Sequence, residues 1–363
     1  MSVDDRTGPA RVVVVEDSLV QRAKLVAVLE SDGDIEVVGE ATTAVEAIAL
    51  VASLRPDVVT LDLNIPDGGG QYALEQIMAH TPTPVLVLSS TVSDRTSAPA
   101  VEALVGGALL AVPKPTRWTA EFESDLRRNV RMIRSVPVIR HMRGRLRGAP
   151  PTPIPHSPPT SQLIAHRRTS PMDSCVVAIA ASTGGPPALA TVLRGLSSLT
   201  APVLIVQHIH ADFVQGFVDW MARVSPLEVV LAQRGQPLRD HCVHIAPGGT
   251  HLCISHDWKI DLVSAPATVH RPSADQLFES VALRAREKGV GVLLTGMGED
   301  GAAGLAAMHR AGAFTIAQDE ATSAVYGMPR AAQRLGAVDQ QLPLQSIAAA
   351  ILRAVQSRTS VRR

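Results

Sequence analysis

The sequence has few cysteines, few aromatic residues and no apolar run that approaches the roughly 20 residues of a membrane span. Its 3 cysteines are an odd number without C-x-x-C spacing, so neither a disulfide framework nor a cysteine zinc site is indicated. We therefore interpret Cys175, Cys242 and Cys253 as free, buried thiols. The N-terminal segment 1–10 is polar and acidic, unlike a signal peptide. These absences predict a cytoplasmic protein that does not insert into a membrane.

Net charge is absent as well, because 34 Lys and Arg residues balance 34 Asp and Glu residues. This balance offers no electrostatic argument for binding nucleic acid or an anionic membrane surface. What the chain does have is length and apolar content. Its 363 residues are 46% hydrophobic, which is enough for two domains with full-sized cores.

The first part of the chain alternates short β-branched runs with segments of helical spacing. Five such runs occur within about 120 residues, which favours a parallel, doubly wound sheet of flavodoxin type. The predicted strands are 12–15, 35–38, 58–63, 85–88 and 109–112. The sequence therefore predicts a five-stranded parallel sheet in an N-terminal domain spanning 10–134.

Polar residues stand at the ends of four of these strands. They are Glu16, Asp17, Asp62, Ser89 and Lys114. The carboxyl ends of parallel strands share one edge, so we expect the five side chains to converge. Three clustered carboxylates repel one another unless a cation lies among them, and oxygen ligands favour Mg²⁺. Lys114 and Ser89 would hold the oxygens of a phosphoryl group on Asp62. The alternative is that all five are ordinary polar residues at strand ends.

A change of composition separates the two predicted domains. The segment 135–173 carries several arginines and then a dense group of prolines, at positions 150, 151, 153, 155, 158 and 159. Proline at this density does not permit a packed helix or a central strand. The arginines have no interleaved aromatic residues and no reader fold, so we do not expect nucleic acid as a partner. We interpret 135–173 as a semi-extended linker between 10–134 and a second domain at 174–357.

The second domain begins with an apolar run, 176–180, that leads to Ser182 and two glycines before a segment of helical spacing. This pattern predicts a strand, a tight turn and a helix, with Ser182 at the carboxyl end of a buried strand. A nucleophile near free backbone N–H groups would suit this place. Ser182 could instead cap the helix, or the turn could cradle a phosphate. The turn lacks the G-x-G-x-x-G spacing, and Ala180 stands where a G-x-S-x-G turn has its first glycine.

Two candidate partners for Ser182 follow other predicted strands. His208 comes after the strand predicted at 201–206, and Asp300 follows the strand predicted at 290–294. In a parallel sheet the three residues would share one rim and could act as nucleophile, base and orienting acid. His208 and His210 could instead bind a metal, but no suitable third ligand accompanies them. Asp300 could simply cap the helix predicted at 302–311.

Three further segments of this domain, 244–247, 250–255 and 259–263, alternate like strands with turns between them. They predict a β meander. We therefore expect a doubly wound, mostly parallel α/β domain that also carries a meander.

Residues 10–117 resemble the receiver domain of two-component response regulators. The matching residues are Glu16-Asp17, Asp62 within Leu61-Asp62-Leu63-Asn64-Ile65-Pro66, Ser89, and Lys114 within Val112-Pro113-Lys114-Pro115. The resemblance implies that Asp62 accepts a phosphoryl group, with Mg²⁺ held by Glu16, Asp17 and Asp62. Gly69 replaces an acid found in many relatives, and Ala111 lies where a switch aromatic often stands. These departures concern the relay of the signal more than the formation of the phosphate.

Residues 174–355 resemble the catalytic domain of chemotaxis protein-glutamate methylesterases of the CheB type. The matching motifs are 181–186, 206–208, 246–249 with His251, 270–273 with Asp275 and Phe278, and 294–298 with Asp300-Gly301. The resemblance implies that Ser182 is the nucleophile, His208 the base and Asp300 the orienting acid. Thr183 and the backbone of Met297 would support the oxyanion. Ala180 replaces the first glycine of the usual motif, which removes no catalytic atom.

The two resemblances together imply a phosphorylation-regulated enzyme. It would hydrolyse glutamate γ-methyl esters on chemoreceptors, release methanol and deamidate particular receptor glutamines, without a cofactor for hydrolysis. A chemotaxis histidine kinase of the CheA type would donate the phosphoryl group, the unphosphorylated receiver would cover the catalytic rim, and we expect a monomer. The alternatives are a non-catalytic module that docks on receptors and the same esterase in a non-motility pathway. A DNA-binding regulator lacks support, because no helix-turn-helix or basic output domain is evident.

Overall fold

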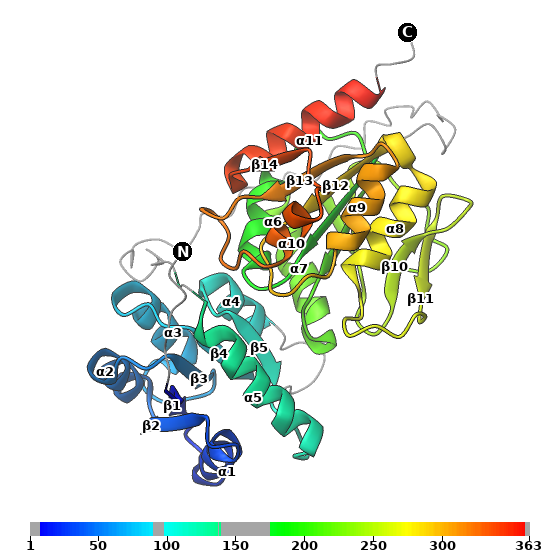
Figure 1. Cartoon of the computed structure of the whole chain (residues 1–363). Helices are drawn as coiled ribbons and strands as arrows, with labels where there is room; N and C mark the ends of the chain where they lie inside the picture. Colours follow the sequence, from blue (N-terminus) through cyan, green and yellow to red (C-terminus); the bar gives the residue numbers. More distant parts are fainter. Residues whose placement is uncertain (1–7, 90–97, 137, 139–174, 360–363) are drawn as a thin grey trace.

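The computed structural model describes residues 8–89, 98–136, 138 and 175–359, which form two α/β domains (Figure 1). Nearly all of the predicted linker, with its arginines and prolines, lies outside the described residues. None of the helices within the described ranges is both long enough and apolar enough to span a membrane.

The N-terminal domain is built on a five-stranded sheet of order β2-β1-β3-β4-β5, in which every neighbouring pair is parallel. This confirms the predicted sheet. Apolar side chains on its two faces form separate clusters under the helices. The elements are β1 (Ala10–Val15), α1 (Leu19–Glu30), β2 (Ile35–Ala41), α2 (Ala44–Leu54), β3 (Val58–Asp62), α3 (Gly69–His80), β4 (Val85–Ser89), α4 (Ala98–Gly106), β5 (Leu110–Pro113) and α5 (Ala120–Arg134).

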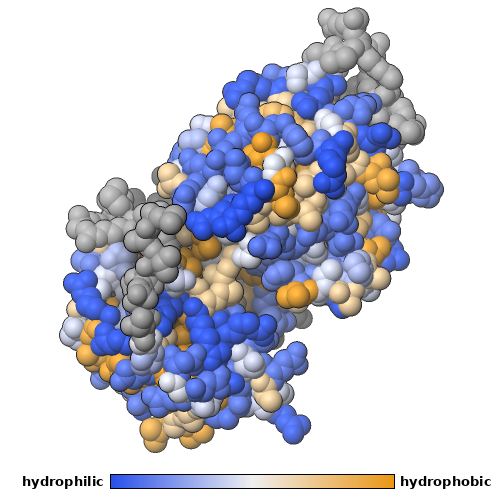
Figure 2. Space-filling model, in the orientation of Figure 1, coloured by the Kyte–Doolittle hydropathy of each residue, from blue (hydrophilic) through white to orange (hydrophobic). Residues whose placement is uncertain are grey.

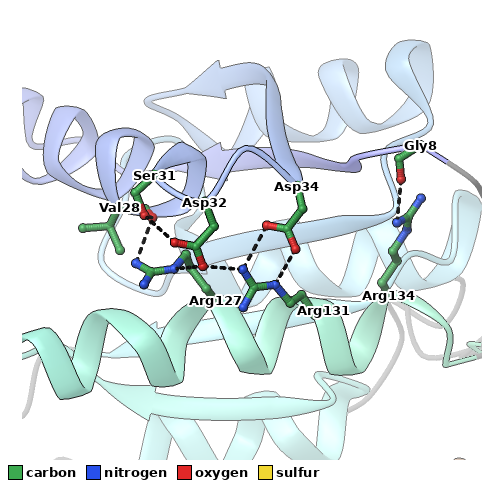
Figure 3. A network of polar contacts seen from close by, with 8 residues as sticks. All are labelled: Gly8, Val28, Ser31, Asp32, Asp34, Arg127, Arg131 and Arg134. Carbon is green, nitrogen blue, oxygen red and sulfur yellow. Dashed lines mark hydrogen bonds and ion pairs between the residues drawn. The ribbon is translucent and has the colours of Figure 1, made fainter.

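An arginine network holds α5 against the turn between α1 and β2 (Figure 3). Arg131 donates to Asp32 at 2.5 Å and to Asp34 at 2.7 Å, and Arg127 donates to Asp32 at 2.8 Å. The shared carboxylate of Asp32 makes this a network rather than isolated surface pairs, which contribute little on their own. The network fixes the position of α5, whose other residues reach the boundary with the second domain.

The C-terminal domain has a seven-stranded sheet of order β14-β13-β12-β6-β7-β9-β8, and all of its neighbouring pairs are parallel. Helices cover both faces over two apolar clusters (Figure 1). The elements are β6 (Val176–Ala181), α6 (Gly185–Arg194), β7 (Val203–Gln207), η3 (Ala211–Phe213), α7 (Val214–Val224), β8 (Glu228–Leu231), β9 (Cys242–Ile245), β10 (His251–Ile254), β11 (Ile260–Val263), α8 (Ala274–Arg284), η4 (Arg286–Lys288), β12 (Gly289–Leu293), α9 (Ala302–Arg310), β13 (Phe314–Gln318), α10 (Met328–Arg334), β14 (Gln340–Leu342) and α11 (Leu344–Thr359).

The predicted three-stranded meander is wrong in its first strand. Only β10 and β11 pair with each other, as an antiparallel two-stranded sheet. β9 instead lies between β7 and β8 in the main sheet and runs parallel to both. Its four residues are all buried, because a central parallel strand is covered on both faces. The three segments follow one another closely along the chain, and this proximity suggested a pairing that the structure does not contain.

The two domains pack directly against each other. Helix α4 contacts α6, α7 and η3, and its residues Ala100, Val101 and Val105 belong to the same apolar cluster as the α6–α7 face. From the other side, Met297 and Val325 pack against the apolar cluster that includes the α5 face. Figure 2 shows hydrophobic residues at the surface where the two domains meet. The carboxyl edge of the C-terminal sheet thus faces the N-terminal domain.

Buried His244 in β9 makes a prediction about stability. Its side chain is inaccessible to solvent, and neither ring nitrogen has a hydrogen-bond partner among the described residues. Burial first, and Arg239 second, lower the pKa of His244 to about 4. The imidazole of His244 binds a proton more tightly in the unfolded chain than in the folded one. The contribution of neutral, buried His244 to stability is therefore intact above the unfolded pKa of about 6.5 and is lost as pH falls toward 4. We expect about 2 kcal/mol of this loss between pH 7.5 and pH 5.

The measurement is urea unfolding of the wild type and of His244→Leu at the two pH values. The variant should lose less free energy of unfolding than the wild type over this interval, because leucine does not titrate. Equal losses in both proteins would contradict the assignment of this pH dependence to His244.

Candidate active site

The three residues predicted for the C-terminal rim are brought together by neighbouring strands. Ser182 follows β6, His208 follows β7, and Asp300 lies in the loop after β12. β6 is flanked by β7 on one side and β12 on the other, so the chain order reverses at β6. A crevice at the carboxyl end of such a switch point is the usual ligand site of an open parallel sheet.

The turn that carries Ser182 is fixed by backbone hydrogen bonds. The Ser182 N–H donates to Thr295 O at 3.0 Å, and Ser182 O accepts from the Gly185 N–H at 2.8 Å. Gly184 has a positive φ of 75°, and a Cβ there would lie 2.5 Å from Ala324 Cβ. Gly296 must also lack a side chain, since a Cβ would lie 2.8 Å from Ser182 Cβ. The two glycines explain how three loops approach one serine.

His208 and Asp300 are directly bonded. His208 Nε2 lies 2.8 Å from Asp300 Oδ2, with the two side chains only 9% and 11% exposed. Because Nε2 faces a carboxylate, it carries the proton in the neutral ring and Nδ1 keeps the lone pair. His208 Nδ1 is buried and has no hydrogen-bond partner among the described residues. Nδ1 is therefore the ring nitrogen with a free lone pair on the side of the cleft that Ser182 also lines.

Asp300 is held by the start of helix α8. Its carboxylate accepts from the Ser273 hydroxyl at 2.8 Å and from the backbone N–H groups of Ala274 at 2.7 Å and Asp275 at 3.1 Å. Burial alone would raise the pKa of Asp300, but the hydrogen bond and charge of His208 together with these donors hold the pKa well below its ordinary value. The N-terminal end of a helix also favours a negative charge. Asp300 thus stays ionised beside His208.

Three neighbours of these residues carry contacts that sequence analysis did not assign. Gln207 Nε2 donates to the carbonyls of Ser182 at 2.8 Å and His208 at 3.0 Å, and so ties the two loops together. His270 stacks on the His208 ring with centroids 4.3 Å apart. Burial, followed by repulsion from His208, lowers the pKa of His270. Ser273, whose hydroxyl bonds Asp300, caps α8. Their presence in the quoted motifs was the only signal available from the sequence.

Ser182 and His208 open into a cleft of about 710 Å³ between the two domains. Thr183, Met297 and His270 line its C-terminal side, whereas β5, α5 and Lys114 line its N-terminal side. Thr183 Oγ1 is buried and without a hydrogen-bond partner among the described residues. Ala111 lies in this wall and packs against the cluster shared by the two domains. The N-terminal domain therefore forms the wall of the cleft that faces the candidate catalytic residues.

The predicted N-terminal rim also assembles. Lys114 Nζ lies 2.6 Å from both Asp62 Oδ2 and Glu16 Oε2. Burial raises the pKa of Glu16 against the opposing effect of Lys114. Ser89 is buried at the end of β4, and its carbonyl accepts from the Lys114 N–H at 2.8 Å. The remaining acid of this rim, Asp17, is exposed to solvent.

One carboxylate oxygen from each of Glu16, Asp17 and Asp62 lies within 4.8 Å of the other two. Three carboxylates at this spacing, one of them open to water, match the ligands that Mg²⁺ prefers. The residues of the rim therefore fit a magnesium ion.

Comparison with known proteins agrees with this geometry. Residues 177–351 match the family model described as CheB methylesterase, and 12–121 match the response regulator receiver domain. The chain is 42% identical to protein-glutamate methylesterase/protein-glutamine glutaminase 2 of Anaeromyxobacter dehalogenans, over 97% of this chain and 98% of the relative. The chain belongs to the CheB methylesterase family.

A second relative of this CheB-type chain also spans nearly all of it, and a solved structure matches its C-terminal half. The protein-glutamate methylesterase/protein-glutamine glutaminase of Agrobacterium fabrum is 41% identical, over 96% of this chain and 97% of the relative. The solved CheB methylesterase catalytic domain of Thermotoga maritima is 30% identical, covers 51% of this chain and 98% of its own, and has a TM-score of 0.48. The receiver family model spans β1 to the start of α5, and the methylesterase family model spans β6 to the middle of α11.

Proposed function

We propose that this chain is a protein-glutamate methylesterase that also acts as a protein-glutamine glutaminase on chemoreceptors. The observation that carries the proposal is the 2.8 Å bond from Asp300 to His208, which lines one cleft together with Ser182. The chain is 42% identical over nearly its whole length to a relative named for these two activities. Its substrates would be chemoreceptors, on the side of the membrane that faces the cytoplasm. We propose domain limits of 10–134 and 174–357 on either side of the linker.

The chemistry follows from the assignment of the imidazole nitrogens. Ser182 Oγ attacks the ester carbonyl carbon while His208 Nδ1 takes the hydroxyl proton, and Asp300 stabilises the resulting imidazolium. When the tetrahedral intermediate collapses, His208 returns that proton to the leaving methoxide and methanol departs. Water then attacks the acyl-enzyme with His208 again as base, which frees Ser182 and glutamate. A glutamine side chain follows the same path and loses ammonia.

The negative oxygen of the intermediate needs hydrogen-bond donors. The Ser182 N–H is already bonded to Thr295 O, so it cannot serve. The N–H groups of Thr183 and Met297 border the cleft and donate to no other backbone carbonyl within the described part of the chain. We propose these two groups as the oxyanion donors, with the unpartnered Thr183 hydroxyl nearby.

The test is methanol release. Membranes that carry chemoreceptors with radiolabelled methyl esters are incubated with the purified protein, and volatile label is counted. We expect release that depends on the added protein. A purified, folded protein that releases no methanol, whether or not it is phosphorylated, would overturn the proposal and would favour a non-catalytic docking module.

In this proposal the rate of hydrolysis is regulated by phosphorylation of Asp62, with a chemotaxis histidine kinase as the donor. The chain would act as a monomer. Mg²⁺ held by Glu16, Asp17 and Asp62 would neutralise charge on the transferring phosphoryl group. Lys114 already bonds Asp62 and would bind one oxygen of the phosphoryl group, with the Ser89 hydroxyl as a second donor. Hydrolysis itself uses the serine, histidine and aspartate of the other rim and needs no cofactor.

Chelation should therefore separate the two activities. With EDTA in excess, incorporation of phosphate from labelled acetyl phosphate should fall to background, because the acids of the receiver rim lose the cation that offsets their repulsion. The basal rate of methanol release by the unphosphorylated full chain should stay within twofold. Loss of basal hydrolysis that added Zn²⁺ or Mg²⁺ restores would contradict this division.

A further inference from the structure

A second groove adjoins the catalytic cleft and has no assigned role. It has a volume of about 610 Å³, and helices α8, α9 and α10 contribute to its walls. Val269 and His270 line both this groove and the catalytic cleft, so the two adjoin each other at the ring that stacks on His208. A polypeptide whose side chain reaches Ser182 has this groove next to it.

The groove differs from the catalytic cleft in what covers it. Every residue that lines it belongs to the methylesterase domain, whereas β5 and α5 of the receiver line the catalytic cleft. The groove is therefore open in the arrangement in which the receiver covers Ser182. It could be occupied before the receiver moves.

Two large apolar side chains of the groove face water. Val269 is 92% exposed and Leu335 is 59% exposed. Exposed apolar side chains at the mouth of a groove gain free energy when a partner covers them. Together they mark an apolar contact for a bound chain.

The charges of the groove are mostly negative. Glu279 and Glu299 are exposed, and neither forms an ion pair within the described ranges. Asp275 and Asp300 also line the groove and are less exposed. Arg334 is the basic residue among the lining side chains. Such walls complement a basic side chain on a partner. They also disfavour the carboxylate product relative to the neutral ester, because like charges repel in a partly desolvated site.

We propose that this groove binds the segment of the substrate polypeptide that flanks the esterified glutamate. The bound segment presents an apolar side chain to Val269 and Leu335 and a basic side chain to Glu279 and Glu299. This inference rests on the proposed methylesterase function and names the surface that recognises the protein substrate. It also explains how a substrate engages the enzyme while the receiver still covers Ser182.

The test compares two substrates of the full-length, phosphorylated protein. One is the labelled chemoreceptor membrane and the other is N-acetylglutamate γ-methyl ester, which has no flanking chain to fill the groove. The quantity measured is the ratio of kcat/KM for the receptor to kcat/KM for the small ester. Leu335→Glu should lower this ratio about tenfold, mainly through KM, because it loses an apolar contact and adds charge. Glu279→Lys should lower it as well.

Leu283 provides the matched control. It is 67% exposed on the same domain and does not line the groove, so Leu283→Glu should leave the ratio unchanged. An unchanged ratio in folded Leu335→Glu and Glu279→Lys enzymes would overturn the inference while leaving the proposed function intact. Equal falls in the ratio for Leu335→Glu and Leu283→Glu would also overturn it. A wild type that hydrolyses neither substrate would overturn the proposed function and this inference together.

Discussion

Replacing Ser182 by alanine is expected to reduce methanol release by about 10⁴- to 10⁶-fold, because the acyl-enzyme can no longer form. The fold should be unaffected: the backbone groups of Ser182 carry its structural hydrogen bonds, to Thr295 O and from Gly185 N–H. The measurements are single-turnover hydrolysis of labelled receptor and the thermal unfolding midpoint. Wild-type turnover by a folded Ser182→Ala protein would show that another group is the nucleophile.

The partners of Ser182 sharpen this prediction. His208→Ala and Asp300→Ala should also be severe, and the double variant Ser182→Ala with His208→Ala should be little worse than Ser182→Ala alone. Non-additivity is expected because His208 Nδ1 has no function in catalysis once the hydroxyl is gone. Fully multiplicative losses in the double variant would contradict a single unit of three residues. His270→Phe is a useful control, since it keeps a ring against His208.

Much of the fold could be predicted from the alternation of apolar strands and helices. The location of both sites could be predicted because their polar residues stand at strand ends. Asp62 ends β3 and Lys114 follows β5 in one sheet, and Ser182 and His208 follow neighbouring strands of the other. Parallel pairing then places each set on one edge. β9 shows the limit of this reasoning. A short buried strand has no periodicity that distinguishes pairing in a meander from pairing within a parallel sheet.

The support around the catalytic residues could not be predicted from residue types and spacing. Gln207 bonds Ser182 and His208 through its side chain, and Ser273 reaches Asp300 from 27 residues away. These contacts depend on how separate loops pack over the sheet edge. The stacking of His270 on His208 has the same origin. Resemblance to a family marked these positions, but only the structure shows which atoms are in contact.

The arrangement of the two domains is the other feature that sequence could not supply. Proline content indicates the stiffness of a tether, not the faces that it brings together. In the structure α4 packs on α6 and α7, and Met297 and Phe122 both pack against the same apolar cluster of the receiver. Met297 also borders the catalytic cleft, so one residue belongs both to the interface and to the proposed oxyanion site.

Lys114 connects the phosphorylation site to this interface. Its amino group bonds Asp62 and Glu16, and the same residue, with Val112 and Pro113 of β5, lines the catalytic cleft. A phosphoryl group on Asp62 brings new negative oxygens to Lys114, so the present ion pairs must rearrange. A rearrangement of Lys114 changes the wall that faces Ser182. Phosphorylation can shift the equilibrium between the covered and open forms only by as much free energy as it stabilises the open form relative to the covered form.

Removing the receiver is therefore expected to raise activity. Residues 174–363 alone should release methanol about 5- to 150-fold faster than the unphosphorylated full chain, which corresponds to a coupling of about 1–3 kcal/mol. The tether keeps the receiver at high local concentration, so the covered form dominates without phosphate. Acetyl phosphate with Mg²⁺ should raise the full chain toward the truncated rate. Asp62→Asn should abolish that response and leave the rate difference between the truncated protein and the unphosphorylated full chain unchanged. Phe122→Glu, which introduces charge at the α5 side of the cleft, should activate the full chain without phosphate. Equal rates for the truncated and full-length proteins, with no response to acetyl phosphate, would show that this receiver, with Ala111 in place of the switch aromatic, does not restrict access to Ser182.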